Sequence, residues 1–359
     1  MKKVYLILEN GCVFEGQGFG AEGEVIGEVV FTTAMTGYLE TLTDPSYFGQ
    51  MVVQTFPLIG NYGVIPEDFE SRKVYLSAYI VRDVCDAPSN FRNQGTLDAF
   101  LKEQNIVGIS GIDTRQLTKI VRESGVMNGI ITSNPELTEE MKKKVHDFVI
   151  RKAVTSTSCE EKEIVAAVGE KKRTVVLMDY GLKRNIAREL SKRGCEVIIM
   201  PHDTKAEDVI KLNPDGIMLS NGPGDPKENV FEIEQINKMF HSGIPMFGIC
   251  LGHQLTAISQ GANTYKLKYG HRGANQPVKN LETGRVYVST QNHGYAVDGD
   301  TLPPQAKVSY INVNDGTCEG VNYSDENVFT VQFHPEACGG PLDTRFLFDE
   351  FIKRMEARK

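Results

Sequence analysis

The sequence predicts an α/β chain with two domains. The C-terminal domain is expected to have a mixed, mainly parallel sheet flanked by helices, and the N-terminal domain to be mostly β (α+β). Strand-like and helix-like runs alternate after residue 174, whereas strand-like runs joined by turn residues dominate before residue 150. The 359 residues, with 40% hydrophobic content, suffice for two cores. We therefore expect domains at 1–150 and 174–359, separated by a linker or boundary region at 151–173.

The N-terminal domain begins with two apolar runs, VYLILE and CVFEG, which Asn10 and Gly11 join. An Asn-Gly pair tolerates the positive φ angles of a tight turn and therefore predicts a hairpin. A further strand-like run, GEVVFTTAMTGY, follows, and the apolar spacing predicts a helix at 113–123. The segment 151–173 is charged and poor in aromatic residues, which is typical of a boundary between domains.

The C-terminal domain alternates between short apolar runs and amphipathic helices, as in right-handed βαβ units that build a covered parallel sheet. The first helix ends in Gly194, a residue type common at helix C-termini, and the last helix carries an apolar stripe. The expected elements are strand 174–181, helix 182–194, strand 196–200, helix 204–212, strand 216–220, helix 231–240, strand 244–250, helix 251–260, a strand-rich stretch at 264–333 and helix 344–357.

Composition and charge limit the kinds of partner and compartment. A net charge of −8 and a pI of about 5.5 argue against nucleic acid or an anionic membrane as the main partner. No apolar run is long enough to span a bilayer, and the start, MKKVYLILENG, is too short for a signal-peptide core. The seven cysteines form an odd number without CxxC pairs, which favours reduced thiols in the cytoplasm.

The stretch GICLGHQ, residues 248–254, places Cys250 between a buried strand and a helix. Gly248 and Gly252 flank the cysteine, as in the sharp strand-to-helix elbow that projects a nucleophile at the edge of an α/β sheet. The N–H groups and dipole of a helix N-terminus favour a thiolate, and the backbone N–H of Leu251 is placed to stabilise an oxyanion. The pattern therefore indicates a catalytic cysteine.

Simpler interpretations of this stretch stay open. A free cysteine at a strand end is more often a small core residue than a nucleophile. His253 lies three positions after Cys250 and suggests a base or half of a metal site, but it has no carboxylate within four residues. The chain also has no second pair at zinc-ligand spacing. We therefore expect His253 to be a helix-surface or packing histidine, and we expect no metal site.

A second histidine ends the strand-like run VFTVQFHPEA, residues 328–337. His334 and Glu336 are two positions apart, so in an extended chain they share a face, and Pro335 between them ends the ladder of backbone hydrogen bonds. A carboxylate that binds one ring nitrogen would direct the other towards a nucleophile. The alternative is a plain polar pair at the end of a strand.

The third piece is LSNGPGDP, residues 219–226, directly after a predicted strand. Its Asn-Gly, Pro-Gly and Asp-Pro pairs are ordinary turn signals, and a plain turn is the simplest interpretation. Successive glycines also expose backbone N–H groups, so Gly222 or Gly224 is a candidate for a second oxyanion donor.

In this order and spacing, SNGPGDP, FGICLGHQ and QFHPEA resemble the class I (triad) glutamine amidotransferase domain over residues 174–359. The three pieces together are far more specific than any one of them alone. The resemblance implies a catalytic triad of Cys250, His334 and Glu336. It also implies that Gly222 and Leu251 donate to the oxyanion and that Gln254 contacts the substrate.

The first half narrows the resemblance. GEVVFTTAMTGYLETLTDPSYFGQ, PLIGNYG and SGIDTRQLTKIVRESG are similar to the N-terminal domain of carbamoyl-phosphate synthase small chains, which other triad amidotransferases lack. QNHGYAV at 291–297 matches the same family, although phenylalanine is frequent where this chain has Tyr295. By this resemblance the L-glutamine site is lined by Ser46, Gly222, Gly224, Leu251, Gln254, Asn292, Gly294 and Tyr295.

The resemblance implies a glutaminase subunit that hydrolyses L-glutamine to glutamate and ammonia through a cysteine thioester. It further implies that ammonia passes to the carbamoyl-phosphate synthase large chain, which makes carbamoyl phosphate, a precursor of arginine and pyrimidines, from bicarbonate and ATP. No cofactor is implied for this chain, and ATP and magnesium are expected on the large chain. In agreement, the sequence contains no GxxxxGK[ST] phosphate-binding loop.

Two rival functions stay open at this point. An amidotransferase of the same class could serve another synthase, such as those for anthranilate or GMP, although the N-terminal domain speaks against this. A regulatory or scaffolding subunit with a spent site is the non-enzymatic alternative. The presence of all three triad residues argues against that alternative.

Overall fold

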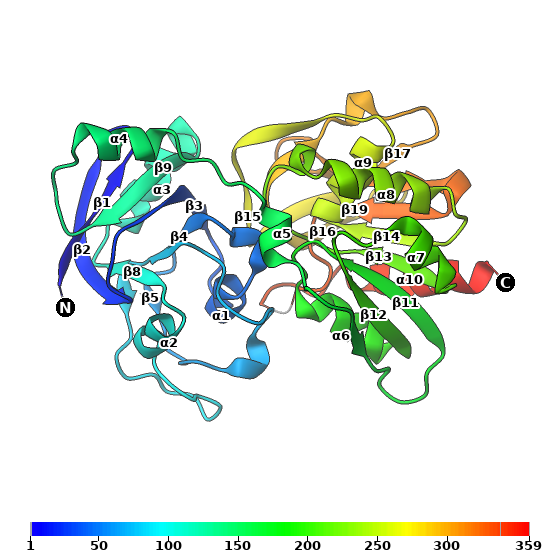
Figure 1. Cartoon of the computed structure of the whole chain (residues 1–359), viewed down its shortest axis with the longest axis horizontal. Helices are drawn as coiled ribbons and strands as arrows, with labels where there is room; N and C mark the ends of the chain where they lie inside the picture. Colours follow the sequence, from blue (N-terminus) through cyan, green and yellow to red (C-terminus); the bar gives the residue numbers. More distant parts are fainter. Residues whose placement is uncertain (1, 338, 359) are drawn as a thin grey trace. The chain divides into compact units, whose positions relative to one another are not determined.

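The computed structural model describes residues 2–337 and 339–358, and the chain divides into two compact units, Met1–Arg151 and Lys152–Lys359 (Figure 1). Each unit has its own sheet and its own hydrophobic core. Within the described residues, no helix combines the length and the apolar character required to cross a bilayer.

The first unit contains a closed β-barrel with the strand order β1-β2-β8-β6-β4-β3-β9. As predicted, β1 and β2 form an antiparallel hairpin, and its turn contains Gly11 with φ 86°. Closure of the barrel leaves no strand edge open for pairing with another chain. The barrel strands are β1 Lys3–Leu8, β2 Val13–Gly20, β3 Val25–Thr32, β4 Gln50–Gln54, β6 Ala78–Ile80, β8 Val107–Ser110 and β9 Met127–Thr132.

Helices and a small parallel sheet complete this unit, which confirms the predicted α+β domain. Helix α3 matches the expected helix at 113–123: Asp113 caps it by accepting from the N–H of Gln116 at 2.9 Å, and Leu117 and Val121 are buried. The remaining elements are α1 Tyr38–Leu42, α2 Leu97–Glu103, α3 Thr114–Ser124, α4 Glu139–His146, and the strands β5 Leu58–Ile59 and β7 Asp83–Val84.

The second unit contains a mixed sheet in the order β10-β12-β11-β13-β14-β19-β18-β16-β15-β17. Strands β12, β11, β13, β14 and β19 run parallel, and the other neighbours pair antiparallel, so the predicted mixed sheet is confirmed. The strands are β10 Glu163–Val165, β11 Arg173–Asp179, β12 Cys195–Pro201, β13 Gly216–Leu219, β14 Met246–Ile249, β15 Thr264–Asn280, β16 Val286–Val297, β17 Lys307–Asn312, β18 Cys318–Tyr323 and β19 Val328–Val331.

Helices cover both faces of the parallel part of this sheet, as expected for strands that are apolar on both sides. Val175 and Leu177 of β11 pack into a core with α6 and α10, whereas Val176 and Met178 pack into a second core with α7, α8 and α9. Because the central strands are parallel, their carboxyl ends meet at one edge, where ligands bind in such sheets. The helices are α5 Ala153–Thr157, α6 Arg184–Lys192, α7 Ala206–Lys211, α8 Val230–Phe240, α9 Leu251–Ser259 and α10 Phe346–Ala357.

The unit boundary falls within the segment 151–173, where a linker or boundary was expected, but most of this segment folds as part of the second unit. Its first part forms α5, whose Ala153 and Val154 are buried, and β10 pairs antiparallel with β12. The charged composition reflects exposure, because β10 is the edge strand of the sheet and most of it faces solvent. The boundary between the units lies at the start of the segment, between Arg151 and Lys152.

Candidate active site

Cys250 lies between β14 and α9 and adopts φ 54° and ψ −101°. A residue other than glycine in such a conformation is strained by about 1–3 kcal/mol, so the surrounding structure must hold it there. The N–H of Cys250 donates to the carbonyl oxygen of Val331 at 2.8 Å, and its own carbonyl accepts from the N–H of Gln254 at 3.1 Å. The predicted strand-to-helix elbow is therefore present, fastened on both sides of the cysteine.

Gly248 and Gly252 are required by close packing at this elbow. A Cβ atom on Gly248 would lie 3.0 Å from the carbonyl of Gly252, and a Cβ atom on Gly252 would lie 2.6 Å from the carbonyl oxygen of Leu219. The N–H of Gly252 also donates to the carbonyl oxygen of Ser220 at 3.0 Å. The glycines thus hold the start of α9 against the loop that follows β13.

The thiol of Cys250 is buried and lies against β16. Its Sγ donates to the backbone carbonyl oxygen of Asn292 at 3.8 Å. Asn292 is one of the positions expected to line the glutamine site, so the structure places that part of β16 directly beside the candidate nucleophile. A substrate amide held along β16 would therefore lie next to the sulfur.

His334 and Glu336 form a short, buried pair. The ring Nδ1 of His334 lies 2.7 Å from Oε1 of Glu336, and both side chains are inaccessible to solvent. A carboxylate partner fixes the proton on Nδ1, which leaves the lone pair on Nε2. Nε2 is buried and has no hydrogen-bond partner among the described residues. This arrangement is the one that a general base requires.

The topology brings this pair and the elbow to the same edge of the sheet. Strands β14 and β19 are parallel neighbours in which Ile249 lies beside Val331. Cys250 follows the first of these residues directly, and His334 follows the second after two residues. The backbone N–H of His334 also donates to the carbonyl oxygen of Thr290 on β16 at 2.9 Å. Residues far apart in the sequence thus emerge from adjacent strand ends.

Lys183 is a member of this site that the sequence analysis missed. Its Nζ lies 3.4 Å from Nδ1 of His334 and 3.8 Å from Oε1 of Glu336. Burial alone would raise the pKa of Glu336, but the charge and hydrogen bond of His334 and the charge of Lys183 hold that pKa below its ordinary value. Asn185 donates from its side chain to the carbonyl oxygen of Glu336 at 3.2 Å. A usable signal was the polar stretch LKRN directly after a strand end.

Gly222, one of the two expected oxyanion donors, packs against the side chain of the other, Leu251. A Cβ atom on Gly222 would lie 2.7 Å from Cδ2 of Leu251 and 2.1 Å from the carbonyl oxygen of Tyr180, which no side chain could accept. Gly224, in the same loop, has φ 90°, and its Cβ would lie 2.8 Å from that of Ala153. The loop after β13 is therefore built for close backbone approach, although its contacts with substrate stay a prediction.

Gln254 links the active-site helix to two strands. Its Nε2 donates to the carbonyl oxygen of Tyr295 at 2.8 Å and to Oε1 of Gln332 at 2.9 Å. A Cβ atom on Gly294, the residue before Tyr295, would lie 3.3 Å from the Arg272 guanidinium. The structure thus places Gln254 beside Gly294 and Tyr295 of β16. The hydrogen bonds of Gln254 also hold α9 against this strand, in addition to its expected contact with substrate.

Ser46 is the one expected glutamine-site residue in the other unit, Met1–Arg151. It lies in a 3₁₀ turn, Pro45–Tyr47, which Asp44 caps by accepting from the Ser46 N–H at 2.9 Å. The serine is buried within that unit. Its contact with glutamine remains a prediction.

His253 was expected to be either a helix-surface or a packing histidine, and the structure shows that it is a packing residue. It is fully buried, its Nδ1 lies 2.8 Å from Oγ1 of Thr330, and burial lowers its pKa to about 3. The imidazole is therefore neutral at physiological pH and has no carboxylate to orient it as a base. Among the described residues, the three potential metal ligands that converge on one another include neither Cys250 nor His253.

Comparison with known proteins agrees with both halves of the fold. Residues 176–354 match the family "Glutamine amidotransferase class-I", and residues 6–131 match "Carbamoyl-phosphate synthase small chain, CPSase domain". The chain is 52% identical over 356 residues to a Fusobacterium nucleatum protein named carbamoyl phosphate synthase small chain, with 98% of both chains covered. Proteins of the same name from Listeria monocytogenes (50% over 361 residues) and Clostridium perfringens (49% over 351 residues) are covered to 98% and 99% of their length.

This chain belongs to the carbamoyl phosphate synthase small chain family. It is therefore a glutamine-hydrolysing enzyme with a class I glutamine amidotransferase domain. The match at 6–131 removes the rival assignment to an amidotransferase of another synthase, because the full-length relatives carry both domains.

Proposed function

We propose that Cys250, His334 and Glu336 carry out the glutaminase reaction of a glutamine-hydrolysing carbamoyl-phosphate synthase. The chain would hydrolyse L-glutamine to glutamate and ammonia and deliver the ammonia to a large synthetase chain. That partner would use bicarbonate and ATP to form carbamoyl phosphate. The single observation that carries the assignment of residues is the strained Cys250 elbow beside the strand end that presents the buried His334–Glu336 pair.

In the first step, the Cys250 thiolate attacks the side-chain amide carbon of glutamine. The backbone N–H groups of Leu251 and Gly222 would stabilise the negative charge that develops on the amide oxygen, and the α carbon of Gly222 packs against the Leu251 side chain. His334, which has taken the thiol proton on Nε2, protonates the departing nitrogen, so ammonia leaves and a glutamyl thioester remains.

In the second step, neutral His334 removes a proton from water, which attacks the thioester carbonyl. The tetrahedral intermediate collapses, glutamate leaves and the sulfur takes back a proton. Glu336 stays ionised throughout, orients the ring through Nδ1 and stabilises the imidazolium. Lys183 favours the ionised carboxylate by its positive charge.

The remaining parts of the proposal concern the partner and the cofactors. Acyl transfer through a thiolate needs no metal or organic group in this chain, so we place ATP and magnesium on the large chain. L-glutamine is the substrate that the β16 positions Asn292, Gly294 and Tyr295 would hold. Cys250 must be reduced to act, and the described cysteines are all free thiols, which fits a reducing cytoplasmic compartment.

The test is Cys250→Ala in the complex with the large chain. We expect glutamine-dependent carbamoyl phosphate synthesis to disappear, while synthesis from added ammonia continues at the wild-type rate. Cys318→Ala, which removes another buried thiol of the same unit, serves as the matched control and should retain glutamine use. Full glutamine-dependent synthesis by the Cys250 variant would refute the assignment.

A further inference from the structure

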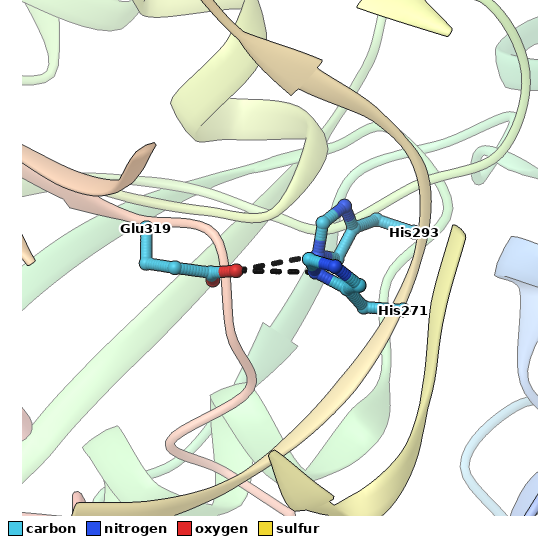
Figure 2. A group of neighbouring side chains, drawn as sticks. All are labelled: His271, His293 and Glu319. Carbon is cyan, nitrogen blue, oxygen red and sulfur yellow. Dashed lines mark hydrogen bonds and ion pairs between the residues drawn. The ribbon is translucent and has the colours of Figure 1, made fainter. Parts of the chain in front are cut away.

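A buried polar cluster lies next to β16 and is not used by the reaction above. It consists of His271 on β15, His293 on β16 and Glu319 on β18. Figure 2 shows the Glu319 carboxylate directed at both imidazole rings. Glu319 is completely buried, and its second carboxylate oxygen has no hydrogen-bond partner among the described residues. Burial of a carboxylate costs free energy unless hydrogen bonds and an opposite charge compensate for the lost solvation.

The Glu319 carboxylate is the centre of the cluster. Its Oε1 lies 3.3 Å from Nδ1 of His271 and 3.9 Å from Nε2 of His293, and it accepts from the side-chain amide of Asn312 at 3.4 Å. The far nitrogen of His271 lies 2.8 Å from the carboxylate of Asp315. The Glu319 side chain on β18 thus contacts residues of β15, β16 and β17.

The charges within the cluster are complementary. Burial alone would lower the pKa of His271, but the carboxylates of Glu319 and Asp315 outweigh it and raise that pKa above its ordinary value. Burial, aided by the nearby charge of His271, lowers the pKa of His293 well below its ordinary value. Burial also raises the pKa of Glu319 above its ordinary value, although His271 and Asn312 oppose this shift. His271 therefore offers a positive charge beside the buried Glu319, and His293 is a neutral group that can donate from only one ring nitrogen.

His293 fastens the strand segment that carries the expected glutamine contacts. Its Nδ1 lies 2.8 Å from the carbonyl oxygen of Tyr295, and its Nε2 lies 3.0 Å from Oε1 of Gln291. The residue before it, Asn292, accepts from the Cys250 thiol, and Tyr295 accepts from Gln254. The neutral ring of His293 donates to one of these two oxygens and packs between Gln291 and Tyr295, in the part of β16 that contacts Cys250 and Gln254.

We propose that Glu319 is a positioning residue of the glutaminase site. By holding His271 and His293 it fixes residues 291–295 of β16 in the geometry that receives glutamine beside Cys250. This inference rests on the function proposed above. It assigns Glu319 an effect on the binding of glutamine rather than on the chemical step, because the carboxylate acts through the residues of β16.

The same three side chains also have the composition of a metal site, since one ligand atom from each lies within 4.8 Å of the others. We favour hydrogen bonding because Nε2 of His293, which lies 3.9 Å from Glu319, already lies 3.0 Å from Oε1 of Gln291, a residue outside the group. A bound ion is therefore the outcome that would overturn the proposal.

The experiment measures glutamine hydrolysis in the complex with the large chain for Glu319→Ala, Glu319→Gln and Glu189→Ala. In Glu319→Ala we expect KM for glutamine to rise about tenfold or more, since one or two buried hydrogen bonds are lost, with kcat changed less than about threefold. Glu319→Gln keeps an acceptor oxygen and should restore KM to within about threefold of wild type. Glu189 is a buried, ion-paired glutamate on α6, so its removal should change stability but not KM.

A milder variant covers the case in which Glu319→Ala does not fold. Asp315→Asn alters the partly exposed carboxylate behind His271 and should raise KM about two- to fourfold, in the same direction. An unchanged KM in a folded Glu319→Ala or in Asp315→Asn would refute the positioning role. So would stoichiometric zinc in purified wild-type protein that is lost in Glu319→Ala. Failure of the underlying function is distinguishable, because Cys250→Ala would then hydrolyse glutamine as wild type does.

Discussion

The first turn of α9 and the segment after β19 each hold a buried histidine, His253 and His334, and only the second is equipped for catalysis. His253 faces the hydroxyl of Thr330, and burial keeps it neutral down to about pH 3. His334 faces the ionised Glu336, with Lys183 beside both groups. The difference shows that a base is identified by the group behind its ring and not by its distance along the chain from the nucleophile.

The largest effect is expected from His334→Asn. Loss of the base should lower kcat for glutamine hydrolysis by about 10³-fold or more, while ammonia-dependent synthesis continues. Steady-state glutaminase and carbamoyl phosphate assays on the complex would measure both. His253→Asn is the matched control, because it changes the same residue type on a buried face and should retain most of the glutaminase rate. Similar losses in both variants would erase the distinction between the two histidines.

Lys183→Met tests the charge behind the catalytic pair and should have an intermediate effect. Because Lys183 helps to lower the pKa of Glu336, its removal should raise that pKa and move the acidic limb of the kcat/KM profile to higher pH. At neutral pH we expect a loss of about tenfold or less. Lys192→Met, on the exposed side of α6, is the control. An unshifted profile would show that Lys183 has no part in orienting the pair.

The smallest effect concerns stability around His253. Its pKa in the folded chain is about 3, below the ordinary value, so the neutral form stabilises the fold above about pH 6.5, and this contribution is lost as pH falls towards 3. Between pH 7 and pH 5 the expected loss is about 2 kcal/mol. His253→Asn should therefore lose less free energy of unfolding over this range than wild type. Urea denaturation at pH 7 and pH 5 would measure this difference. An equal loss of the free energy of unfolding in His253→Asn and wild type would contradict the assigned burial.

Much of the second unit could be predicted from the sequence because its signals are local. Alternating apolar runs give β11 to β14 and their helices, and the Gly-x-Cys-x-Gly pattern reports a backbone that must pack closely, which the contacts of Gly248 and Gly252 confirm. The pairing of His334 with Glu336 also follows from local geometry, since residues two apart in an extended chain share a face.

The remaining features depend on pairing between distant segments, which the sequence does not encode locally. The barrel of the first unit closes through β2–β8 and β3–β9, whose partners are far apart in the chain. The segment at 151–173 looked like a linker because an exposed edge strand and a linker have the same polar composition. Lys183 and Glu319 lie far in sequence from His334 and His293, and only the folded sheet brings them together.

The central claim is that Cys250 is the nucleophile and that His334, not His253, serves it. Rapid acid quenching of the complex during turnover of L-glutamine, followed by peptide mass spectrometry, tests it most directly. We predict a glutamyl adduct on the peptide that contains Cys250 in wild type and in His253→Asn, and its loss in His334→Asn. An adduct on another cysteine, or one that requires His253 but not His334, would contradict the account.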